Sequence, residues 1–192
     1  MVYMHKFIAV FMTLLLSGCA AQTYKVPTSL NLAKLRFYLT PRVAANSSVA
    51  ITAYPDGKCE NKTQITDLGE SQQIGGLKPA NAVSGGIDAG VPKNPDSTYQ
   101  KNNYVEIAIE ADKTFYFAMV RGNGKIISFG PPMVCGINMQ FNPQTDKTYQ
   151  ALFNYNDAEK NCSLSLSEVK VVDGIYRHLN VASPEQRFFC PY

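Results

Sequence analysis

The sequence predicts an all-β domain, and three observations lead to this fold class. Several runs alternate apolar and polar residues with β-branched or aromatic enrichment, whereas the periodicity of an amphipathic helix is nearly absent. Turn sequences such as Pro55-Asp56-Gly57 and Asp173-Gly174 separate these runs. The cysteines after residue 19 are even in number, as in chains stabilised by disulfides. We therefore expect an antiparallel β-sandwich of about seven or eight strands with two disulfides, immunoglobulin-like or transthyretin-like in build.

The first segment of the chain, residues 1–18, has the order of a secretory signal. A short start that contains Lys6 precedes an apolar run from Phe7 to Leu16. As a helix this run would span about 15 Å at ~1.5 Å per residue, whereas a bilayer core needs roughly 20 residues. We therefore expect the run to act as a signal peptide and not as a transmembrane anchor.

The signal ends in Leu16-Ser17-Gly18-Cys19, which resembles the lipobox of bacterial lipoproteins. The resemblance implies cleavage between Gly18 and Cys19, followed by S-diacylglycerol and N-acyl (palmitate-type) lipid on Cys19. An ordinary signal with an incidental cysteine is the alternative. Acyl methylenes contribute about 0.8 kcal/mol each, so several chains hold a protein on a membrane almost permanently. Ala20 and Ala21 follow. In such lipoproteins this favours the outer membrane, with the domain facing the periplasm or the cell surface.

We expect residues 19–31 to form the lipidated N-terminus and a short tether. The tether is predicted because the segment lacks apolar periodicity and contains Pro27. Such a tether spans at most roughly 40 Å at ~3.3 Å per residue. Residues 32–192 are enough for a single domain with a hydrophobic core. The formal net charge is +3, without a basic cluster, so nothing favours a nucleic acid as a partner.

The strands of this domain are predicted from alternation, in order along the chain. They are Ala33–Leu39, Ser48–Tyr54, Tyr104–Glu110, Thr114–Arg121, Lys125–Phe129, Val134–Phe141, Thr148–Tyr155 and Cys162–Val172. The clearest hairpin joins Phe115–Arg121 to Lys125–Phe129 through Gly122-Asn123-Gly124, because Asn-Gly between apolar strands is a strong hairpin signal. Phe115, Tyr116 and Phe117 alternate faces, so either the two phenylalanines or Tyr116 would point inward. We expect these rings to pack in the core, and an aromatic binding surface is the alternative. Residues 69–103 predict an extended loop or pair of loops, and loops this long are often functional.

Four cysteines remain in the domain: Cys59, Cys135, Cys162 and Cys190. An exported chain is expected to form two disulfides from them, with three possible pairings. We favour Cys59–Cys135 with Cys162–Cys190, because the second bridge would tie the last segment to a neighbouring strand. A zinc site is not expected, since no two of these cysteines lie within four residues of each other and only His178 follows the signal.

A wider resemblance covers most of residues 32–190. An F-x-P-x-x-x-x-x-Y segment lies between two cysteines, as in a family of small, uncharacterised proteobacterial envelope lipoproteins. Its residues here are Cys135, Phe141, Pro143, Tyr149 and Cys162. Three further segments belong to the resemblance: Tyr54-Pro55…Cys59, Asp88-Ala89-Gly90-Val91-Pro92 and residues 104–111. The resemblance implies a disulfide-linked β-sandwich and brings no activity with it.

No catalytic residue set is predicted. His178 is the one candidate base for a nucleophile, and no Gly-x-Ser-x-Gly sequence accompanies it. It is expected to be a surface or partly buried strand histidine. Glu106 and Glu110 would lie about 13 Å apart on one strand at ~3.3 Å per residue, too far for a glycosidase pair. We expect both on the solvated face. The apolar residues of that strand are expected to point inward: Val105, Ile107 and Ile109.

These observations predict a non-enzymatic envelope lipoprotein, an accessory or assembly protein that binds a protein partner. The alternative is a binding or inhibitory module for a host factor or an envelope carbohydrate, since small disulfide-bonded sandwiches often have such sites on loops. In either case the lipid would attach the domain to the membrane, and no metal or other cofactor is expected.

Overall fold

The computed structural model describes residues 24–40, 47–69, 89–95, 97, 103–123, 135–156, 159 and 161–181. Within them the chain forms nine β-strands and no helix. The strands are β1 (Leu32–Thr40), β2 (Ser47–Ala53), β3 (Thr63–Gly69), β4 (Tyr104–Glu110), β5 (Phe115–Asn123), β6 (Cys135–Phe141), β7 (Thr148–Asn156), β8 (Asn161–Val172) and β9 (Ile175–Asn180).

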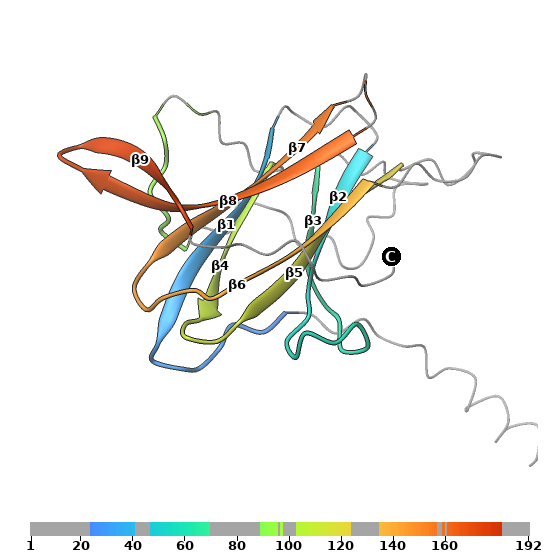
Figure 1. The fold of residues 1–192 in the computed structure, drawn as a ribbon, viewed down its shortest axis with the longest axis horizontal. Coiled ribbons are helices and arrows are strands. Elements are labelled where there is room, and N and C mark those ends of the chain that lie inside the picture. The colour runs from blue at the N-terminus through green and yellow to red at the C-terminus, as the bar shows by residue number, and fades with distance from the viewer. Residues whose placement is uncertain are drawn as a thin grey trace, which may run out of the picture.

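The strands form two sheets that pack against each other (Figure 1). One sheet has five strands in the order β4-β1-β7-β8-β9, and the other has four in the order β3-β2-β5-β6. Neighbouring strands are antiparallel, except that β1 and β7 run parallel. The predicted all-β, sandwich-like fold is therefore confirmed, with one parallel pair that we did not expect. The immunoglobulin-like or transthyretin-like build stays a prediction.

The core lies between the sheets, because alternate side chains of each strand point inward. Phe37 of β1 meets Phe117 of β5 edge to face, with ring centroids 5.2 Å apart. Phe141 of β6 meets Tyr149 of β7 in the same way at 5.1 Å. Phe117 is fully buried and Phe115 packs partly buried against the same cluster, so of the two orientations left open by the sequence, the one with both phenylalanines facing inward is observed.

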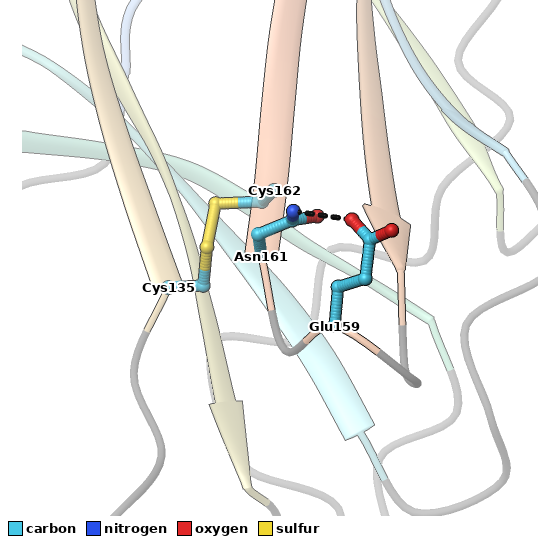
Figure 2. Close-up of a disulfide and its surroundings, with 4 residues drawn as sticks. All are labelled: Cys135, Glu159, Asn161 and Cys162. Atoms are coloured by element: carbon cyan, nitrogen blue, oxygen red, sulfur yellow. Dashed lines mark hydrogen bonds between the residues drawn. A yellow bond between two sulfur atoms is a disulfide. The ribbon is translucent and has the colours of Figure 1, made fainter.

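A disulfide between Cys135 and Cys162 joins the two sheets (Figure 2). Cys135 begins β6, Cys162 lies near the start of β8, and their Cα atoms are 6.1 Å apart. The expected pairing of Cys59–Cys135 with Cys162–Cys190 is therefore wrong. It failed because β6 and β8 meet across the sandwich, and spacing along the chain does not reveal that proximity. Cys59 is also disulfide-bonded, and Cys190 lies outside the described residues.

The predicted hairpin of Phe115–Arg121 with Lys125–Phe129 is wrong. β2 and β6 pair with the two edges of β5, so no further strand has room beside it. β5 also continues through Gly122 to Asn123, where we expected a turn. The segment 125–129 itself lies outside the described residues.

Two strands, β3 and β9, were not predicted. β3 lies at one edge of the four-stranded sheet, and its register with β2 shifts between Ile51 and Thr52. The turn that leads into β3 was predicted: Gly57 has φ +67°, and a Cβ there would lie 2.8 Å from the Tyr116 ring. Glycine is therefore required at that position.

Residues 24–31 run from β3 toward β1 along one side of the sandwich. The Tyr24 N–H donates to the Gln64 carbonyl of β3 at 2.9 Å, and the Tyr24 hydroxyl donates to the Ala108 carbonyl of β4 at 3.0 Å. Burial, with Glu110 nearby, raises the pKa of Tyr24 to about 12. The segment that we expected to be part of a short tether is hydrogen-bonded to the domain at Tyr24 and at Asn31, whose carbonyl accepts from the Ala111 N–H at 3.0 Å, while Val26 and Leu30 between them are exposed. Residues 1–23, with the predicted signal and Cys19, lie outside the described residues.

Candidate docking site

The outer face of the five-stranded sheet contains a buried ion pair. Arg36 of β1 lies beside Glu106 of β4 on one side and Gln150 of β7 on the other. Arg36 Nη2 is 2.6 Å from Glu106 Oε1, and neither side chain has exposed surface. Buried charges are tolerated only when their remaining hydrogen-bonding groups are also satisfied. Residues 89–95, which we call the strap, supply the hydrogen-bonding partners that the ion pair needs.

The ion pair binds the backbone of the strap. Arg36 donates from Nη1 to the Pro92 carbonyl at 2.9 Å and from Nη2 to the Val91 carbonyl. Glu106 Oε2 accepts from the N–H groups of Ala89 at 2.7 Å and Val91 at 3.2 Å. Because the pair offers both donors and acceptors, it fixes the strap on the sheet with charge-assisted hydrogen bonds.

We expected Glu106 to lie on a solvated face of β4, and this prediction is wrong. The three apolar residues of that strand do point into the core, as predicted: Val105, Ile107 and Ile109. Glu106 points to the opposite face, but the strap covers it completely. Of the two glutamates, Glu110 is partly exposed, and it forms a surface ion pair with Lys113.

The β8–β9 hairpin projects from one side of the molecule, where Figure 1 shows it in orange and red. Its turn has φ +54° at Asp173 and +74° at Gly174, the two positive values of a type I′ turn, which suits the twist of a hairpin. The predicted turn is confirmed, but we missed the strand that follows it. The signal was present, because Asp-Gly between Val172 and Ile175 is typical of a two-residue hairpin.

One side of this hairpin exposes apolar side chains. Because side chains alternate along a strand, Val172 lies on the same side as the core residues Leu164 and Leu166. Its register partner Ile175, and Leu179 further along β9, share that side. The four-stranded sheet does not cover them, and they are 42%, 55% and 39% exposed, respectively. Exposed apolar side chains that lie together are typical of an interaction surface; here Val172 and Ile175 are adjacent, and the Lys170–Arg177 pair separates them from Leu179.

Basic side chains accompany this apolar group. Glu168 of β8 accepts ion pairs from Lys147 and Lys170, each at 3.0 Å. Burial alone would raise the pKa of Glu168, but the hydrogen bonds from the two lysines outweigh it and lower that pKa. Arg177 is exposed, lies opposite Lys170 in the register and forms no ion pair among the described residues. This side of the hairpin therefore has an excess of positive charge.

His178 lies on the other side of the hairpin and is exposed, as expected for a strand histidine. Its Nδ1 is 2.7 Å from Ser167 Oγ, and its ring meets that of Tyr176 edge to face at 5.0 Å. Burial of the ring, and then the positive charge of Arg36, lower the pKa of His178. Within the described part of the chain, the hydrogen-bond and ring contacts of this histidine are with Ser167 and Tyr176, whereas hydrolase triads use a carboxylate to orient the base.

The remaining predicted site residues lie outside the described part of the chain: Gly18, Cys19 and Cys190. Among the residues that are described, no three His, Cys, Asp or Glu side chains gather into a possible metal site. The same residues contain no helix with the length and apolar character needed to cross a membrane. Comparison of the chain with known protein families and with curated proteins gives no match.

Proposed function

We propose that this chain is a bacterial lipoprotein, attached to the outer membrane by lipid on Cys19, and that its β-domain is a non-enzymatic docking module for an envelope protein. The observation behind the docking function is the apolar side of the β8–β9 hairpin, formed by Val172, Ile175 and Leu179. Fully burying an exposed aliphatic side chain of this size contributes about 1.5–3 kcal/mol, and these three, at 39–55% exposed, would each contribute about half of that. A partner that covers all three would therefore gain considerable binding free energy.

The cysteines fit the proposed anchor. Cys135 and Cys162 pair with each other, and Cys59 is disulfide-bonded. If Cys19 carries lipid, it is removed from disulfide pairing, and Cys190 is the one remaining partner for Cys59. We therefore infer a second bridge, Cys59–Cys190. No observation on the described residues specifically favours the alternative of a module for a host factor or a carbohydrate.

Photo-crosslinking in cells tests the docking function. A photoreactive amino acid replaces Val172 or Ile175 in the full chain, and the matched control places it at Lys113, which is 69% exposed on the turn after β4. We expect the same envelope protein to be cross-linked from both hairpin positions and not from position 113. Ile175→Asp should remove the product formed from position 172 while leaving the amount of protein unchanged. Capture no stronger than at position 113 would contradict the docking function.

A further inference from the structure

The backbone of β9 can pair with one more strand. Val172 and Ile175 flank a two-residue turn, so they form a hydrogen-bonded pair, and the pairs Lys170–Arg177 and Glu168–Leu179 repeat that pattern two residues further on. The residues of β9 that alternate with these partners point their N–H and C=O groups the other way, away from β8. These outward groups include those of His178 and Asn180, and β9 is the last strand in its sheet among the described residues.

We propose that an extended, acidic segment of a partner protein adds to β9 as a sixth strand of this sheet. The inference rests on the docking function proposed above and specifies the class of partner. A polypeptide strand supplies carbonyl and N–H groups at the spacing of the outward groups on β9. This is β-strand addition, in which the main chain contributes affinity and the alternating side chains contribute specificity.

The side chains of β9 define the sequence of the added strand. On the apolar side, the new strand would lie across from Ile175, Arg177 and Leu179, which are apolar, basic and apolar in turn. Arg177 already has the like charge of Lys170 on its other flank. A carboxylate in the added strand would neutralise Arg177, and apolar residues on either side would cover Ile175 and Leu179. The expected pattern is apolar-x-acidic-x-apolar, which reads the same in both strand directions.

Two other occupants fit this edge less well. A second copy of β9 centred on Arg177 would bring Arg177 against Arg177, and like charges directly opposite each other are destabilising. Centred on His178, it would place Arg177 opposite Leu179 and supply no counter-charge. An anionic membrane would satisfy Arg177 and the apolar side chains. It has no strand backbone to pair with the outward groups of His178 and Asn180.

Amide hydrogen exchange in the full chain, held in detergent micelles, tests the inference. The probe is the peptide Thr-Val-Thr-Glu-Thr-Val-Thr with blocked ends, and the control peptide has Lys in place of Glu. We expect the acidic peptide to slow exchange at His178 and Asn180 saturably, and the Lys peptide to bind about tenfold more weakly, as expected when a favourable cross-strand charge pair becomes a repulsive one. Arg177→Glu should reverse this preference.

A matched pair of variants separates backbone pairing from side-chain contact. His178→Pro removes an N–H that points away from β8, a position at which edge strands tolerate proline, and it should abolish protection of Asn180. His178→Ala keeps that N–H and should bind the acidic peptide as the unmodified chain does. Thermal unfolding of both variants checks that the hairpin remains folded.

Three results would overturn the inference: no protection at saturating peptide, equal binding of the acidic and basic peptides, or protection of the same amides by anionic vesicles. If crosslinking still captures a partner in that case, the docking function stands and strand addition is wrong. Conversely, peptide binding without any captured partner leaves strand addition in place and contradicts the docking function.

Discussion

The guanidinium of Arg36 binds a carboxylate, a side-chain amide and two backbone carbonyls at once. Its partners are Glu106, Gln150, Val91 and Pro92. An isolated buried charge would cost several kcal/mol, but these partners replace the water that Arg36 loses on folding. The same contacts hold the strap, so a change in either charge affects both the sheet and the segment that covers it.

We therefore expect Arg36→Met to lower the free energy of unfolding by about 3–5 kcal/mol, because it leaves the carboxylate of Glu106 buried without a counter-charge. Arg36→Met combined with Glu106→Gln should cost less than the sum of the two single changes, because neither charge is then unpaired. Urea unfolding of the three variants measures these losses. Lys113→Met, at an exposed surface ion pair, is the control and should stay within about 0.5 kcal/mol. Strictly additive losses would show that the two charges do not act as a pair.

Single residues show what alternation predicts and what it does not. It assigned Val105, Ile107 and Ile109 to the core, because the inward side of a strand follows from the sequence of that strand alone. It missed the burial of Glu106, whose counter-charge lies 70 positions away and whose cover comes from a different segment. Such burial depends on tertiary contacts, which a single strand does not encode.

At the level of strands and loops, the prediction was best where turn chemistry is specific. The turns at Gly57 and at Asp173-Gly174 were found, because positive φ favours glycine and a few polar residues. β3 was missed because the register with β2 shifts between Ile51 and Thr52, which interrupts simple alternation. β9, the strand with the candidate site, could have been found from the Asp-Gly turn. The exposure of β9 to solvent could not have been predicted from the sequence.

The disulfide that joins β6 to β8 leads to a prediction at this scale. Cys135 and Cys162 are separated by 27 positions, and a closed loop of that length stabilises a fold by about 3–4 kcal/mol through the unfolded state. The double change Cys135→Ala and Cys162→Ala should lower the free energy of unfolding by that amount in chemical denaturation. Peptide mapping without reduction should recover a fragment that links Cys135 to Cys162. A fragment that links Cys59 to Cys135 would contradict this pairing.

For the whole molecule, the prediction concerns its attachment to the membrane. Cys19→Ala should abolish labelling by a fatty-acid analogue and leave the precursor uncut, because the lipid-accepting thiol is missing. Cys59→Ala is the control and should still be labelled and processed. Gel mobility and metabolic labelling measure both effects. Normal processing of the Cys19→Ala chain would show that the signal is of the ordinary secretory kind.

The two hydrogen bonds of Tyr24 determine where such an anchor would join the domain. With lipid on Cys19, residues 19–23 would separate the anchor from Tyr24 by at most roughly 17 Å at ~3.3 Å per residue. Tyr24 binds β4 at one edge of the five-stranded sheet, and the β9 hairpin forms the opposite edge. Four strand spacings of ~4.8 Å separate these edges, or roughly 20 Å. In such an anchored molecule the linker would join the sheet at its β4 edge, and β9 would be the edge farthest from the attachment point.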